Sequence, residues 1–348
     1  MDRFLDVLCL FDSPEDQQWA EKLTVGLIQR GLSARVLAAT LPHQMDAVRA
    51  DTVVGIVSED LPAGIHLAIQ HRKRGLLLTQ TTRPRPGTTV SVWQWSPPLD
   101  VTDDFFLGQI GDFCHQHRDY VRSHTDYLIR ALAWANQHRQ GDFLLPGEAC
   151  QQAEDWLSQH FITEQPPCVP TQLQCEYISE SLKQANGNMA QVCLVGDGTR
   201  ENLDHMRRAL MRSGITVWSP PWDVPAAADY GKALRWGVET ADNLVLLVSA
   251  AAMARDSWQQ ALERAQKLHK RIIPVLLEPL STRQMPAALQ SLQGIDLTDK
   301  QGAHYGQNQQ ALIQILRKGE TYHHWHKRIL VQALAWEAAP LLLLPLAP

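Results

Sequence analysis

The sequence predicts an α/β protein with two doubly wound parallel-sheet domains in tandem, joined by a helical linker. The length of 348 residues exceeds what a single hydrophobic core usually organises. Apolar runs alternate with amphipathic segments, as in parallel strands covered by helices on both faces. The same series of elements also occurs twice in the same order, which favours duplication of one domain.

The first elements of each copy are a strand and a helix. Residues 7–12 and 192–197 are apolar runs that end in aspartate, as expected of buried strands. Each is followed by an amphipathic segment that stops at Gly31 or Gly214, where glycine can end a helix in a left-handed turn.

Two further strands follow in each copy. Residues 50–58 match residues 241–249, because both begin with Ala-Asp, continue as an apolar run and end in serine. Residues 73–78 match residues 270–275, in which a basic pair precedes a buried strand. Basic side chains suit the negative end of the preceding helix.

A long helix closes each copy. The repeated residues are Tyr120, His124 and 131–134 in the first copy and Tyr322, His326 and 333–336 in the second, all at one constant separation. These matches predict a first domain at residues 1–118, a helical linker at 119–189, a second domain at 190–318, and a C-terminal helix and tail at 319–348. Within the linker, the proline-rich stretch 163–170 should interrupt regular structure.

The composition argues against nucleic-acid and membrane partners. A net charge of −5 creates no field that would attract phosphate backbones. Without a stretch of about 18 apolar residues, no transmembrane helix is expected, and the first residues lack the features of a secretory signal. Six cysteines without CxxC spacing favour a reduced, cytoplasmic setting.

The second copy resembles a TIR (Toll/interleukin-1 receptor) domain over about residues 190–318. The resemblance is carried by residues 217–225, 240–249, 256–258, 269–275, 284–289 and 294–297. It implies a flavodoxin-like fold, which the internal match extends to a divergent first copy at residues 5–118. The helix at residues 333–336 resembles the segment that follows TIR domains in large bacterial proteins, especially cyanobacterial ones.

The TIR resemblance implies two activities. TIR domains self-associate to transmit signals, in bacterial defence among other settings, so the expected partners are other TIR domains and an effector C-terminal to this chain. Many members also cleave NAD into nicotinamide and ADP-ribose or a cyclic variant. That reaction implies a glutamate, on the helix after the third strand, that stabilises oxocarbenium-like charge. No cofactor is required, and NAD would be a substrate or ligand.

The glutamate that NAD cleavage implies is displaced in this chain. Its family position, four residues after Trp258, is Leu262, and alignment backward from the next strand gives Ala261. Glu263 is therefore the candidate catalytic residue, one helical step of about 100° away from that position. The alternative is an exposed helix charge. In the first copy the corresponding helix, residues 61–75, contains no acid.

A strand-to-helix turn is the candidate nucleotide-binding element. Gly196, Asp197 and Gly198 follow a strand and precede a helix, where backbone amides can hold a phosphate. With Trp258 they form the predicted nucleotide site. The alternative is a simple turn, because the full glycine-rich fingerprint is missing.

The loop after the second strand of the second copy is the candidate interface. In TIR domains this loop mediates contacts between neighbouring modules, which here implies Trp222, Asp223, Val224 and Pro225. A rigid indole gives a large contact area, so Trp222→Ala should weaken assembly without unfolding the chain. The alternative is that Trp222 folds back onto its own domain.

Two histidine clusters, residues 114–117 and 323–326, lack the ligand spacing of a metal site, so no metal is expected. His124 and His326 occupy the same repeat position and are predicted to pack or to form hydrogen bonds. The sequence thus predicts a TIR-type signalling and assembly module. An NAD glycohydrolase and a nucleotide-sensing module that binds without cleaving are the alternatives.

Overall fold

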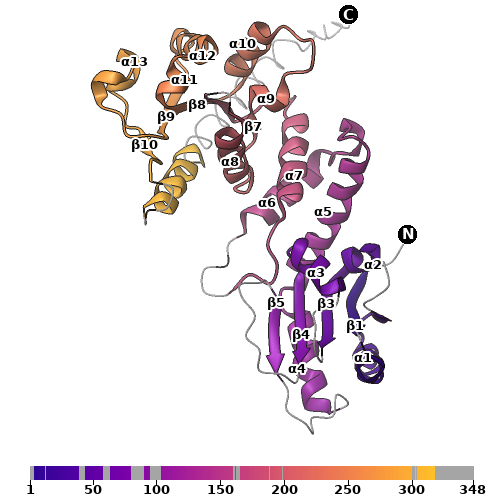
Figure 1. Ribbon diagram of the computed structural model, residues 1–348. Helices are drawn as coiled ribbons and strands as arrows, with labels where there is room; N and C mark the ends of the chain where they lie inside the picture. The colour runs from indigo at the N-terminus through magenta and orange to yellow at the C-terminus, as the bar shows by residue number, and fades with distance from the viewer. Residues whose placement is uncertain are drawn as a thin grey trace, which may run out of the picture. The chain divides into compact units, whose positions relative to one another are not determined.

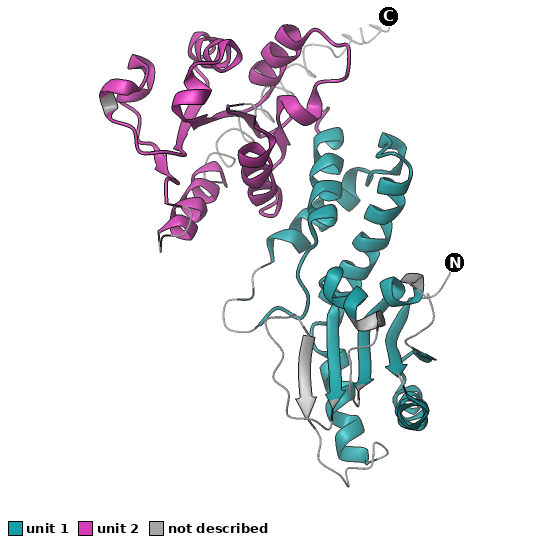
Figure 2. Ribbon diagram, in the orientation of Figure 1, with its two compact units in different colours: residues 1–185 teal, residues 186–348 magenta. Residues whose placement is uncertain are grey.

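The computed structural model describes residues 4–11, 13–38, 44–57, 63–79, 90–94, 103–159, 161, 165–187, 189–197, 199–299, 302 and 304–317. The chain divides into unit 1, residues 1–185, and unit 2, residues 186–348 (Figure 2). Gly198 and the predicted C-terminal helix and tail, with Tyr322 and His326, lie outside the described residues.

Unit 1 is built on a parallel sheet of five strands in the order β2-β1-β3-β4-β5 (Figure 1). The strands are β1 (Leu5–Phe11), β2 (Ala34–Ala38), β3 (Ala50–Val57), β4 (Arg74–Thr79) and β5 (Val90–Gln94). In the register of the sheet, Val7 of β1 pairs with Ala34 and with Thr52. The apolar runs that predicted β1, β3 and β4 lie between helices on both faces, as a parallel sheet requires.

Helices from the first two-thirds of unit 1 cover its sheet. They are α1 (Pro14–Gln29), α2 (Gln44–Arg49), α3 (Ala63–Gln70) and α4 (Asp104–His115). The first of them begins at Ser13, whose hydroxyl accepts a hydrogen bond from the Asp16 amide at 3.0 Å. One core lies between the sheet and α1 and α4, around Leu23 and Ile110, and a second lies towards α2 and α3.

The helices after α4 also belong to unit 1. They are α5 (Arg118–Asn136), η1 (Gly141–Phe143), α6 (Gly147–Ser158) and α7 (Gln172–Ala185). Helix α5 packs against α2, β3 and α7, and the Trp156 indole N–H donates to the Tyr120 carbonyl at 3.0 Å. The segment predicted as a linker is therefore, as far as residue 185, part of the first compact unit.

Unit 2 repeats the sheet order of unit 1. Its five parallel strands run β10-β9-β8-β6-β7 and are β6 (Val192–Val195), β7 (Val217–Trp218), β8 (Asn243–Val248), β9 (Arg271–Leu276) and β10 (Ile295–Asp296). Numbered within each unit, both sheets have the order 2-1-3-4-5, which is the flavodoxin-like order. The predicted fold class, two flavodoxin-like parallel sheets in one chain, is confirmed.

Helices cover both faces of the second sheet (Figure 1). The elements are α8 (Arg200–Met211), α9 (Pro220–Asp223), α10 (Tyr230–Thr240), α11 (Ala250–Met253), α12 (Asp256–Lys267), η2 (Thr282–Gln284), α13 (Ala287–Gln290) and a helix over residues 305–317. Helices α10 and α12 pack together on one face.

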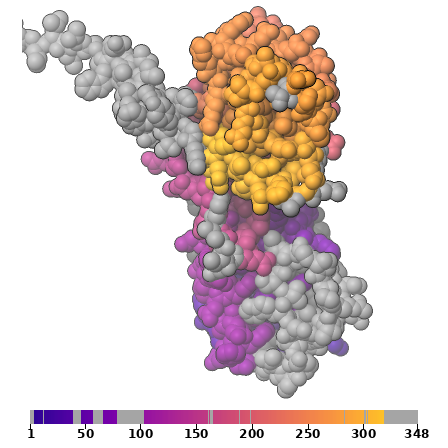
Figure 3. All heavy atoms as spheres, turned by 90° about the vertical axis from the view of Figure 1, so that its left-hand side faces the viewer, coloured from indigo at the N-terminus to yellow at the C-terminus, as the bar shows by residue number. Residues whose placement is uncertain are grey.

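The opposite face of the second sheet carries α8 and the helix over residues 305–317, which is yellow on the surface in Figure 3. Arg317 ties the two helices together, because its guanidinium donates to the Ser213 carbonyl at 2.8 Å. No helix among the described residues has the length and apolarity that a bilayer span requires.

Candidate functional site

The carboxyl ends of the strands in unit 2 carry a polar side chain after each of four strands. Asp197 follows β6 by two residues, Ser219 follows β7, Ser249 follows β8 and Glu278 follows β9 by two residues. In open α/β sheets ligands bind at this edge, where the strand order reverses. In unit 2 the reversal lies between β6 and β8.

The predicted nucleotide-binding turn lies at this edge, and its polar group is already engaged. The Asp197 carboxylate accepts from the amide and the hydroxyl of Thr199, at 2.9 and 2.6 Å. Gly196 is packed closely, because a Cβ there would lie 3.2 Å from side-chain atoms of Leu203 and Leu247. The structure therefore gives the turn a packing role and places a negative charge at the start of α8.

The polar side chains after β8 and β9 also accept hydrogen bonds from backbone amides. The Ser249 hydroxyl accepts from the Ala252 amide at 3.1 Å and so caps α11. The Glu278 carboxylate accepts from the amide of Ala250, at the first residue of the same helix. Glu278 was not singled out from the sequence, although an acid two residues after a buried strand is a readable signal.

Trp258 and Glu263 point in different directions from α12. Trp258 is completely buried, and its indole N–H donates to the Leu247 carbonyl at 3.0 Å. Ala261 and Leu262 continue the buried stripe, whereas Glu263 is exposed. Because α12 leads back to the start of β9, its second half runs away from the carboxyl edge. The structure therefore does not bring Glu263 together with Gly196 and Asp197.

Trp222 is half-buried against its own unit. Its ring lies beneath two guanidinium groups of α8, with the Cζ atoms of Arg200 and Arg207 at 5.7 and 5.2 Å from the ring centroid. Arg200 also donates to the Pro221 carbonyl at 3.2 Å. Sequence reasoning missed this pair of arginines because they are separated from the loop by a strand.

The rest of the predicted interface loop divides into a fixed and an exposed part. The Asp223 carboxylate accepts from the Ser219 amide at 2.7 Å, and Val224 packs against the core of unit 2. Pro225 and the residues that follow it, through Tyr230, are exposed. Of the four predicted interface residues, the structure therefore presents Pro225 most openly.

Unit 1 has a network of ion pairs at the opposite, amino edge of its sheet. Arg122 of α5 donates to Asp51 at 2.5 Å and to Asp6 at 2.6 Å, and Arg118 donates to Asp6 at 2.7 Å. Burial raises the pKa of the Asp51 carboxyl, and it lowers the pKa of the nearby Lys73 to about 8. These ion pairs fasten α5 to the sheet.

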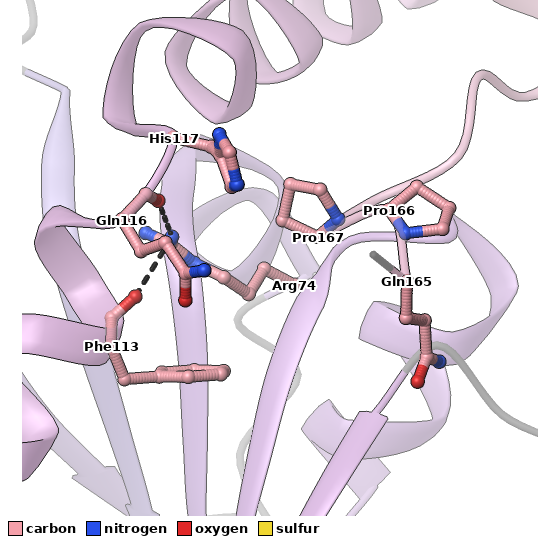
Figure 4. Close-up of a pocket in the computed structure, with 7 residues that line it drawn as sticks. All are labelled: Arg74, Phe113, Gln116, His117, Gln165, Pro166 and Pro167. Atoms are coloured by element: carbon pink, nitrogen blue, oxygen red, sulfur yellow. Dashed lines mark hydrogen bonds between the residues drawn. The ribbon is translucent and has the colours of Figure 1, made fainter. Parts of the chain in front are cut away.

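A pocket of about 140 Å³ lies beside this network (Figure 4). Arg74 lines the pocket, and its guanidinium is already engaged by backbone carbonyls. The guanidinium of Arg74 donates to the carbonyls of Phe113 at 3.0 Å, and of Gln116 and Cys114 at 2.6 Å each. Arg74 therefore caps the carboxyl end of α4, and its role is structural. Pro166 and Pro167, in the stretch expected to break regular structure, form another wall.

Comparison with known proteins relates part of unit 2 to a known domain family. No curated protein matches the sequence. The TIR domain of the Toll-related receptor TRR-2 from Hydra magnipapillata is 17% identical, with a match over 37% of this chain and 98% of that chain and a TM-score of 0.33. A TIR-STING receptor from C. gigas, solved in complex with 2′,3′-cGAMP, is also 17% identical. That match covers 36% of this chain and only 39% of the receptor, with a TM-score of 0.31. Residues 197–313 match the family model of the TIR domain, and this segment of unit 2 is thereby assigned to that family.

Proposed function

We propose that this chain is a signalling module that acts by self-association through its TIR domain, in the setting of bacterial defence. The observation that carries the proposal is the loop between β7 and α10. Trp222, Asp223 and Val224 fix its first half on unit 2, and the second half is exposed. A loop held in one conformation loses little entropy when it binds a partner.

Two aromatic side chains extend the exposed part of the loop onto α10. Tyr230 is 47% exposed and Trp236 is 41% exposed. Tyrosine and tryptophan are the side chains that most often dominate the binding energy of interfaces. We therefore place the contact surface at residues 225–236, which shifts it towards the C-terminus from the predicted Trp222.

Unit 1 would serve as a second, divergent TIR-like copy. Its sheet has the same strand order as that of unit 2, which supports duplication of one domain. Two copies in one chain offer two surfaces, and head-to-tail contacts between such chains build open filaments unless the rotation closes a ring. The partner in this arrangement is another copy of this chain, and an effector would respond to the assembly.

Analytical ultracentrifugation of the full chain over a range of concentrations tests the proposal. The wild-type mass should rise with concentration. Since such anchors contribute about 2 kcal/mol each, Tyr230→Ser or Trp236→Ser alone should weaken association by roughly thirtyfold, and the two combined by up to roughly a thousandfold. Phe105→Ser is the matched control, because Phe105 is an exposed aromatic (71%) on α4 of unit 1. A wild-type chain that stays monomeric, or equal loss in the control, contradicts the proposal.

NAD cleavage has weaker support, because Glu263 is exposed on the second half of α12 and Trp258 is buried. Incubating the purified chain with NAD and measuring released nicotinamide tests this activity directly. Turnover that disappears in Glu263→Gln would replace assembly with catalysis as the main function.

A further inference from the structure

A cleft of about 250 Å³ opens on the face of unit 2 that carries α8 and the helix over residues 305–317. It is lined by Glu201, Asn202, His205, Met206, Leu277 and Tyr305. The four residues from α8 are spaced so that they share one side of the helix, since side chains four apart are neighbours on its surface.

The cleft lies at the carboxyl end of the sheet and on the face opposite to Glu263. Leu277 follows the last residue of β9, and its amide donates to the Val248 carbonyl at 3.0 Å. Leu276 packs into the core on the side of α10 and α12. Because successive side chains of a strand point to opposite faces, Leu277 faces α8. The sheet therefore separates the cleft from α12.

The lining of the cleft suits a flat ring that bears N–H groups. The rings of His205 and Tyr305 lie 6.1 Å apart between centroids and are tilted by 52°, so they form one aromatic wall. Met206 and Leu277 supply apolar surface, and Glu201 and Asn202 supply hydrogen-bond acceptors.

Charge and size exclude larger or anionic ligands. None of the described residues that line the cleft is a lysine or an arginine, and the Glu201 carboxylate would repel a phosphate. The volume of about 250 Å³ also lies below the roughly 300–1,000 Å³ typical of pockets for drug-sized molecules. A dinucleotide does not fit these limits, whereas a single base does.

We propose that this cleft binds the base of a free purine nucleoside, which stacks on Tyr305 and His205 and donates its N–H groups to Glu201 and Asn202. The site is separate from the assembly surface at residues 225–236 and does not depend on Glu263. A ligand bound here could regulate the TIR unit in the monomer as well as in an assembly.

Isothermal titration of the full chain with adenosine, guanosine and AMP tests this assignment. At least one of the two nucleosides should bind saturably, and AMP should bind no more tightly than adenosine. Tyr305→Leu should weaken binding at least about tenfold, the scale of one lost stacking contact, whereas Tyr305→Phe should retain it. Glu201→Gln should also weaken binding, because a carboxylate accepts stronger hydrogen bonds than an amide.

Asp256→Asn is the matched control, because it removes an exposed carboxylate of α12, on the other face of the same unit, and should leave binding unchanged. Circular dichroism of each variant verifies that the fold is intact. The proposal is overturned if neither nucleoside binds saturably, if AMP binds more tightly than adenosine, or if Asp256→Asn weakens binding as much as Glu201→Gln.

Discussion

Protonation of His124 should destabilise unit 1, because the imidazole is buried and a charge there would not be hydrated. His124 lies on α5 with 1% of its surface exposed, and its Nε2 is 3.1 Å from the Val169 carbonyl oxygen. Burial, together with the positive charge of Lys73, lowers the pKa of His124 from 6.5 to about 3. The unfolded chain restores the ordinary pKa, so acid favours unfolding.

The size of this effect follows from the two pKa values. Between about pH 6.5 and pH 3 the unfolded chain binds a proton at His124 that the folded chain does not. The free energy of unfolding therefore falls as the pH is lowered through this range. At about 1.4 kcal/mol per pH unit, and with half-protonation near pH 6.5, His124 alone should remove about 2 kcal/mol between pH 7 and pH 5.

Urea denaturation at pH 7 and at pH 5, followed by circular dichroism and tryptophan fluorescence, measures this loss. His124→Gln keeps a donor for the Val169 carbonyl but cannot titrate, so its loss of stability on acidification should be about 2 kcal/mol smaller than that of the wild type. His115→Gln, at an exposed position of α4, should behave as the wild type. If His124→Gln shows the same dependence on pH as the wild type, the reasoning is refuted.

Two other substitutions test the packing and the ion pairs. In Gly237→Ala the new Cβ would lie 2.3 Å from the Trp218 ring, so the free energy of unfolding of unit 2 should fall by about 1–3 kcal/mol in urea titrations; an unchanged midpoint would show that the ring moves freely. Arg122→Gln should cost unit 1 about 3 kcal/mol at pH 7, because it leaves the buried Asp51 without its guanidinium partner. A loss below about 1 kcal/mol would mean that another donor replaces it.

The central strands of both sheets were predictable from the sequence because each is encoded locally, whereas β5 (Val90–Gln94) was not singled out. The apolar runs at residues 50–58 and 241–249 contain β3 (Ala50–Val57) and β8 (Asn243–Val248), each beside the first strand of its unit. The buried stripe of α12 from Trp258 to Ala265 also follows from helical spacing alone.

The candidate sites were less predictable, because they depend on contacts between distant segments. The stacking of Arg200 and Arg207 on Trp222 requires the exact approach of α8 to a loop beyond the next strand. The cleft needs Tyr305, about a hundred residues after Glu201, to complete its wall. No local pattern encodes such distances.

The ion pairs between α5 and the first sheet determine where this protein can be divided. A fragment that ended at residue 117 would keep Asp6 and Asp51 but discard the arginines that neutralise them. Both carboxylates would then lose their guanidinium partners, and the surface of unit 1 that α5 covers would be exposed to water. Dissection is better made after residue 185, because Arg118 and Arg122 then stay in the same fragment as Asp6 and Asp51.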